Sequence, residues 1–81
     1  MNWSVYIIQA NDKSYYTGIT TNIKRRFKQH VNGCGAKFFN GRIPIKVVYT
    51  EDGHTRSSAC KREATIKKLH REAKEALIKQ Y

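Results

Sequence analysis

Residues 4–30, SVYIIQANDKSYYTGITTNIKRRFKQH, decide the fold of the first half of this 81-residue chain. They contain two short tyrosine motifs ten residues apart, Ser4-Val5-Tyr6 and Tyr16-Thr17-Gly18. β-Branched and aromatic residues dominate 3–9 and 14–19, with turn-forming residues between them, so the pattern predicts an antiparallel hairpin. Gly18 interrupts the second strand, which indicates a close backbone approach or a bulge. N-cap residues at 20–22 and an Asn-Gly pair at 32–33 bound a predicted helix over 23–31.

The remainder of the chain predicts one more strand and a helical C-terminal segment. Residues 33–42 carry three glycines among basic and aromatic residues and are expected to form a flexible basic loop. A strand is predicted over 45–50 and a turn over 51–54. Nothing breaks a helix from 55 or 57 to 81, a length that indicates two helices with a bend near His70-Arg71. The expected fold is one α+β domain over 1–81, a three-stranded, largely antiparallel sheet flanked by helices in the order β-β-α-β-α-α.

The charge balance predicts a polyanionic partner. Sixteen Lys and Arg against six Asp and Glu give a net charge of +10, and such a field attracts nucleic acid. The plainer alternative is a basic protein without that partner. No apolar stretch reaches the ~20 residues that cross a bilayer, and the N-terminus lacks a signal-peptide pattern. The two cysteines fit neither a disulfide scaffold nor a metal site. These features predict a cytoplasmic protein with no membrane partner.

The predicted helix over 23–31 carries two polar residues beside its apolar face. Ile23, Phe27 and Val31 share a face that spans roughly 80°. Arg26 and His30, four residues apart, stack on one flank of that face. Both can therefore point along the sheet toward a shared site. Alternatively, Arg26 is a solvated cation and His30 a residue at the boundary of the core.

Glu63 stands in or beside an apolar stripe of the C-terminal segment that includes Ala59, Ile66 and Leu69. A carboxylate directed toward a core is costly unless a cation pairs with it. The residue is therefore either a metal ligand or one half of an exposed i,i+4 ion pair with Lys67.

Tyr6 and Tyr16 on adjacent antiparallel strands can present their hydroxyls on the same face. The unperturbed pKa of tyrosine is about 10, so it moves protons at neutral pH only beside a metal-bound water and cationic neighbours. The alternative is an ordinary cross-strand aromatic pair.

In combination, the two tyrosine motifs, the helix that carries Arg26 and the later Glu63 resemble the GIY-YIG nucleases, most of all the small stand-alone bacterial group. Ser4 and Val5 stand where that family has Gly and Ile. The resemblance implies a metal-dependent endonuclease that hydrolyses phosphodiester bonds in DNA. The catalytic residues that it implies are Tyr6, Tyr16, Arg26, His30 and Glu63.

The resemblance also implies one divalent metal, Mg²⁺ or else Mn²⁺, with Glu63 as its ligand. Gly18 is then the motif glycine that lets the backbone approach the scissile group. A non-catalytic basic module that binds nucleic acid on the same fold is the alternative.

Nucleic-acid contacts are predicted at Lys24, Lys28, Lys37 and Arg42. The loop over 33–42 interleaves basic residues with phenylalanines, which suits phosphate contacts and base stacking, or the phenylalanines fold under as core. Its arrangement resembles the equivalent segment of small branched-DNA nucleases, which indicates a structured or branched substrate. Of the two nucleic acids, DNA is expected more than RNA. A protein partner that supplies specificity is a further expectation.

Overall fold

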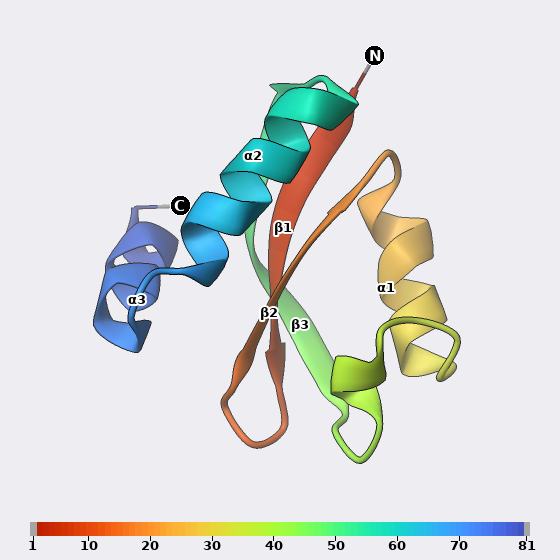
Figure 1. The fold of residues 1–81 in the computed structure, drawn as a ribbon. Helices are drawn as coiled ribbons and strands as arrows, with labels where there is room; N and C mark the ends of the chain where they lie inside the picture. The colour runs from red at the N-terminus through yellow and green to blue at the C-terminus, as the bar shows by residue number, and fades with distance from the viewer. Residues whose placement is uncertain (1, 81) are drawn as a thin grey trace.

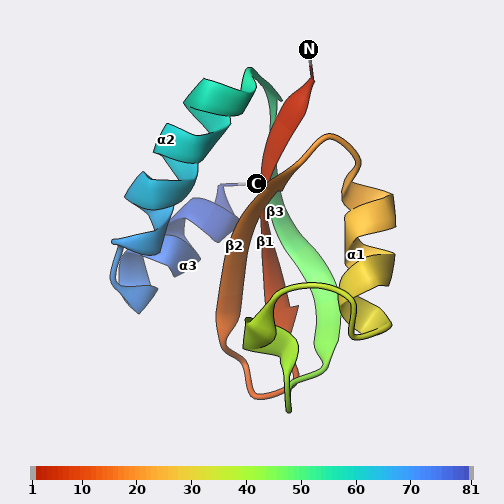
Figure 2. The same cartoon turned by 45° about the vertical axis from the view of Figure 1, so that its right-hand side comes forward.

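The computed structural model describes residues 2–80 and has the element order predicted from the sequence, with one short 3₁₀ helix added in the loop. The elements are β1 (Trp3–Ala10), β2 (Tyr15–Thr20), α1 (Ile23–Val31), η1 (Lys37–Phe39), β3 (Pro44–His54), α2 (Arg56–Lys67) and α3 (Arg71–Lys79). The strands form an antiparallel sheet in the order β2-β1-β3. Figures 1 and 2 show α1 next to β3, while α2 and α3 lie on the other side of the sheet. No helix within residues 2–80 is long and apolar enough to cross a membrane.

The central strand β1 builds two core layers, because successive side chains of a strand point to opposite faces. The layer under α2 and α3 contains Val5, Ile7, Tyr49, Ala59 and Ile66. The layer on the other face contains Tyr6, Ile8, Ala10 and Phe39, and residues of α1 and η1 pack against it. The first tyrosine motif therefore lies on the face that α1 and η1 cover.

Strand β3 is longer than predicted, and the turn expected over 51–54 is wrong. Val5 pairs with Glu51 and Trp3 with His54, with register shifts along the strand. Gly53 has φ +79°, a conformation that glycine adopts at little cost. Glu51 and His54 do not mark a turn, because they belong to this edge strand. They pair with the start of β1 and contact α2.

Glu51 connects β3 to α2. Its carboxylate accepts hydrogen bonds from the Tyr49 hydroxyl at 2.7 Å, from His54 Nε2 at 2.7 Å and from Arg62 Nε at 3.1 Å. His54 Nδ1 lies 2.9 Å from the Oγ of Ser58, which caps the start of α2. Burial opposes ionisation of the carboxyl, but the three hydrogen bonds outweigh it and lower the pKa of Glu51.

The bend predicted near His70-Arg71 is confirmed. Helix α2 ends at Lys67, and α3 begins at Arg71 with His70 as its N-cap. The bend lets both helices follow the sheet, since Ile66 of α2 and Leu77 of α3 pack in the same layer.

Replacing Glu51 by Gln should lower the free energy of unfolding at pH 7 by ~1.5–3 kcal/mol, the range for hydrogen bonds to a charged group. The folded pKa of Glu51 lies below its ordinary value of 4.5. The ionised carboxylate therefore adds to the free energy of unfolding above pH 4.5. This contribution is lost as the pH falls through the folded pKa of Glu51. Urea unfolding at pH 7 and pH 3 should show the gap between wild type and E51Q closing at the lower pH.

The control for this substitution is Glu75→Gln, which removes an exposed i,i+4 ion pair with Arg71. It should change the free energy of unfolding by only about 0.3–0.5 kcal/mol. Equal losses for the two variants at pH 7 would contradict the structural role of Glu51.

Candidate active site

The ring of Tyr6 lies across Gly18. The two residues are direct partners in the antiparallel register of β1 and β2, which runs without a shift. A Cβ at Gly18 would lie 2.5 Å from the Tyr6 Oη and 3.0 Å from the Tyr16 ring. Of the two interpretations of this glycine, close approach is therefore correct and a bulge is not.

The Tyr6 hydroxyl is hydrogen bonded to His30 of α1, with Oη and Nε2 2.9 Å apart and both residues buried. The backbone N–H of Ala36 donates to His30 Nδ1 at 3.4 Å. This contact leaves Nδ1 as an acceptor and places the ring proton on Nε2, so His30 donates to the Tyr6 oxygen. Gly35 allows the loop to come this close, because a Cβ there would collide with the imidazole.

His30 is 1% exposed, so its assignment to the boundary of the core is wrong. Burial first, and the positive charge of Arg26 second, lower the pKa of His30 to about 4. The imidazole is therefore neutral at pH 7, as its acceptor contact with the backbone requires.

Aromatic residues hold the imidazole in place. The ring centres of Tyr16 and Phe39 lie 5.2 Å and 4.8 Å from that of His30. Phe39 is buried, so it folds under as core. Phe38 is only half-buried; its ring lies 5.4 Å from that of Tyr16 and 4.4 Å beneath the Arg42 guanidinium. Of the two loop phenylalanines, Phe39 is therefore core, whereas Phe38 stays partly open to solvent.

Arg26 and Glu63 both act on the Tyr6 hydroxyl, although they come from α1 and α2 on different sides of the sheet (Figure 1). Burial raises the pKa of Tyr6 to about 12, and the charges of Tyr16 and Glu63 add to the rise. Arg26 opposes it through a hydrogen bond and its charge. The charges of Arg26 and Glu63 are thus close enough to Tyr6 to influence its ionisation, while His30 and Tyr16 contact its ring directly.

The Glu63 carboxylate forms an ion pair with Lys67, with Oε2 and Nζ 3.2 Å apart. The i,i+4 pair considered from the sequence thus exists. The same ammonium group lies 5.9 Å from the centre of the Tyr16 ring, which places the pair at the edge of the tyrosine cluster. The Glu63 side chain is 23% exposed, so a ligand can reach it from solvent.

The residues present fit a metal held by a single protein carboxylate. Within residues 2–80 no three or more His, Cys, Asp and Glu side chains gather as a metal site. Mg²⁺ commonly keeps several waters and takes one or two carboxylates together with substrate phosphates. Glu63, which has a partly exposed oxygen pair beside the tyrosine cluster, suits that chemistry.

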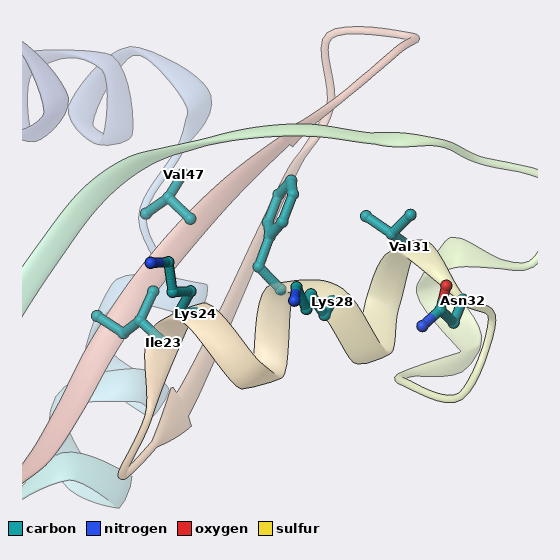
Figure 3. Close-up of a pocket in the computed structure, with 7 residues that line it drawn as sticks. Ile23, Lys24, Lys28, Val31, Asn32 and Val47 are labelled. Carbon is teal, nitrogen blue, oxygen red and sulfur yellow. The ribbon is translucent and has the colours of Figure 1, made fainter.

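The basic residues predicted to contact nucleic acid fall in two places. Lys37 begins η1, and Arg42 follows it beside Phe38, where it also forms an ion pair with Asp12 at 2.9 Å. Lys24 and Lys28 line a groove between α1 and β3 (Figure 3). None of the five catalytic candidates lines that groove.

The sequence did not identify Gly35, Ala36 and Phe39 as supports of the site. Their roles arise only when the loop folds back onto α1, and no residue type marks Gly35 among the three loop glycines. The one available signal was the mixture of glycine and aromatic residues in the loop.

The comparisons with known proteins show the family of this chain and its fold. The sequence model of the GIY-YIG catalytic domain matches residues 2–76. UPF0213 protein CPE1444 of Clostridium perfringens is 50% identical over 78 residues, which are 96% of this chain and 83% of the relative. UPF0213 protein VNG_2274C of Halobacterium salinarum is 47% identical over 74 residues, or 91% and 96% of the two chains. The solution NMR structure of UPF0213 protein BH0048 from Bacillus halodurans is 41% identical, with a TM-score of 0.63 and coverage of 99% and 85%.

Replacing Gly18 by Ala should force the Tyr6 ring away from His30, because the added methyl group occupies the place of the hydroxyl. Overpacking of this kind costs ~1–3 kcal/mol of folding free energy. Urea unfolding checks the loss, and the NMR signals of the His30 ring should move.

The matched control is Thr17→Val, one residue earlier on the same strand but pointing to the opposite face. Among residues 2–80 its buried Oγ1 has no hydrogen-bond partner, so losing it should be neutral or stabilising. A G18A protein as stable as the wild type, with unchanged His30 signals, would refute the close-approach explanation.

Folding free energy should depend on pH through His30. Its folded pKa, about 4, lies below its ordinary value of 6.5, so the unfolded chain binds more protons between these values. The contribution of neutral His30 to the free energy of unfolding should thus be fully present above pH 6.5 and decline as the pH falls toward 4. Urea unfolding from pH 4 to pH 8 should show a flatter dependence for His30→Gln, while His70→Gln, at an exposed position, keeps the wild-type slope. Identical slopes for H30Q and wild type would contradict this account.

Proposed function

This chain belongs to the GIY-YIG catalytic domain family, and we propose that it is a metal-dependent endonuclease that hydrolyses phosphodiester bonds in DNA. The observation that supports the proposal most is the buried hydrogen bond from His30 Nε2 to the Tyr6 oxygen above Gly18. The nuclease domain implies a nucleic-acid substrate, and the net charge of +10 suits one.

Tyr6 is the proposed general base: once its own hydroxyl proton has passed to solvent, the phenolate takes a proton from the attacking water. Its oxygen already has a donor in His30 and a second in Arg26. Both donors favour the phenolate that proton transfer needs; burial outweighs the effect of Arg26, so the pKa of Tyr6 is still raised to about 12. Neutral His30 orients this oxygen and donates to it.

Arg26 and Glu63 have separate tasks in this scheme. Arg26 places a fixed positive charge beside the reacting phosphate, where negative charge grows in the transition state. Glu63 would hold Mg²⁺ or Mn²⁺, which when bound supplies Lewis-acid polarisation of a phosphoryl oxygen and makes a water more acidic. Lys67, now paired with Glu63, would be free to contact a phosphate once that carboxylate is engaged. Tyr16 packs against His30 and limits its movement.

The substrate is expected to approach over η1 and the loop that follows. Phe38 offers a half-buried ring beside Tyr16, and Lys37 and Arg42 offer charge for phosphates. A base that stacks here has to leave a regular duplex, which favours structured or branched DNA as substrate. Lys24 and Lys28 add to the positive field of the molecule from the other side of α1.

Cleavage should require a divalent metal and the residues around Tyr6. Labelled single-stranded, duplex and branched DNA, with matched RNA, are incubated with the protein and Mg²⁺ or Mn²⁺. We expect cleavage of branched DNA, a loss of ~10²–10⁴-fold in Tyr6→Phe and a loss of ~10²–10³-fold in Arg26→Ala. Glu63→Gln should abolish the metal-dependent rate.

Arg25→Ala is the control, because it removes one exposed positive charge from the same helix at a side chain that contacts Thr21. It should cleave at nearly the wild-type rate. Salt-sensitive binding of DNA without cleavage of any substrate would reject the enzyme and favour the alternative, a non-catalytic nucleic-acid-binding module on the same fold.

A further inference from the structure

A groove of about 840 Å³ separates α1 from β3 and lies outside the catalytic cluster (Figure 3). Its apolar walls are Ile23, Phe27 and Val31 of α1 and Val47 of β3. A cavity of this size is large enough for several apolar side chains of a ligand. The groove exists because the apolar face of α1 packs on the sheet only through its first turns, which leaves Val31 53% exposed.

Exposed hydrophobic residues also lie immediately before β3 and at its start. Ile43 and Ile45 are 60% and 52% exposed, and with Val31 they are the large hydrophobic residues that the described chain leaves most open. Figures 1 and 2 show the C-terminal end of α1 beside the start of β3. Exposed apolar patches of this kind mark interaction sites in soluble proteins.

The charge around the groove indicates the kind of partner. Lys24 and Lys28, one helical turn apart, stand at its rim, and no carboxylate lines it. A second copy of this chain would bring the same lysines and a further net charge of +10 to the contact, which disfavours self-association. Charge complementarity therefore selects an acidic partner.

The residue types that line the groove indicate which class of acidic partner it suits, a protein or a nucleic acid. Nucleic-acid bases bind by stacking on aromatic rings, but three of the four apolar wall residues are aliphatic and only Phe27 is aromatic. Aliphatic walls suit aliphatic side chains. We propose that the groove between α1 and β3 docks an amphipathic segment of a partner protein, with aliphatic residues on one face and acidic residues flanking them.

A segment docked in the groove would contact α1 without covering the catalytic cluster. Arg26 and His30 lie on one flank of α1, and the groove uses another. Docking is therefore separable from cleavage, and the proposal does not depend on the proposed nuclease activity.

The test uses a fluorescein-labelled helical peptide of Leu and Glu with Leu at i, i+3, i+4 and i+7. The comparison probes are the same peptide with Lys for Glu, and single-stranded oligothymidylate. Fluorescence anisotropy should show the acidic peptide binding at least roughly tenfold more tightly than the basic one. Amide signals of the ¹⁵N-labelled protein should move along α1 and the first half of β3.

Variants at exposed positions of the groove keep the fold and test the assignment. The affinity for the acidic peptide should fall by roughly tenfold or more in Val31→Gln, and likewise in the double variant Lys24→Glu, Lys28→Glu. Lys68→Glu, at the exposed C-cap of α2, reverses one charge away from the groove and should have a much smaller effect. Val31→Gln should leave DNA cleavage unchanged.

Three results would overturn the proposal. Equal binding of the acidic and basic peptides, or signals that move elsewhere, would remove the groove as their site. Displacement of the peptide by oligothymidylate, with Val31→Gln weakening both, would assign the groove to nucleic acid. A concentration-dependent dimer that Val31→Gln abolishes in analytical ultracentrifugation would assign it to a second copy.

Discussion

The buried hydrogen bond between Tyr6 and His30 is the contact on which the arrangement of the site depends. It joins the central strand to α1, and it exists only because Gly18 and Gly35 leave room for the two rings. Burial shifts the pKa of both groups toward the neutral form, to about 12 and about 4. Breaking the pair would leave a buried polar group without its partner, which is costly, so the two rings stay together.

Helix α1 contributes to two surfaces because its side chains point in different directions around the helix axis. Arg26 and His30 face the sheet with the tyrosine motifs. Val31, with Lys24 and Lys28, faces the groove toward β3. A nine-residue helix thus contributes residues to the candidate active site on one side and to the groove on another.

Local sequence signals predicted most of the elements. The hairpin, the helix over 23–31 and the bend near His70 follow from β-propensity, caps and helix length. The turn over 51–54 failed because Glu51 and His54 are polar for a tertiary reason, the network that ties β3 to α2. Propensity counts such residues as turn formers and cannot detect partners that are distant in sequence.

For the site, the sequence by itself determined which residue types are available and at what spacing: two tyrosines on paired strands, Arg26 and His30 one turn apart, and Glu63 beside an apolar stripe. Only the tertiary structure decided that His30 is buried and neutral, that Phe39 and Gly35 hold it there, and that Lys24 and Lys28 lie at a separate groove. The physical reason is that spacing sets the face of an element, whereas burial and pKa depend on the segments that fold against that face.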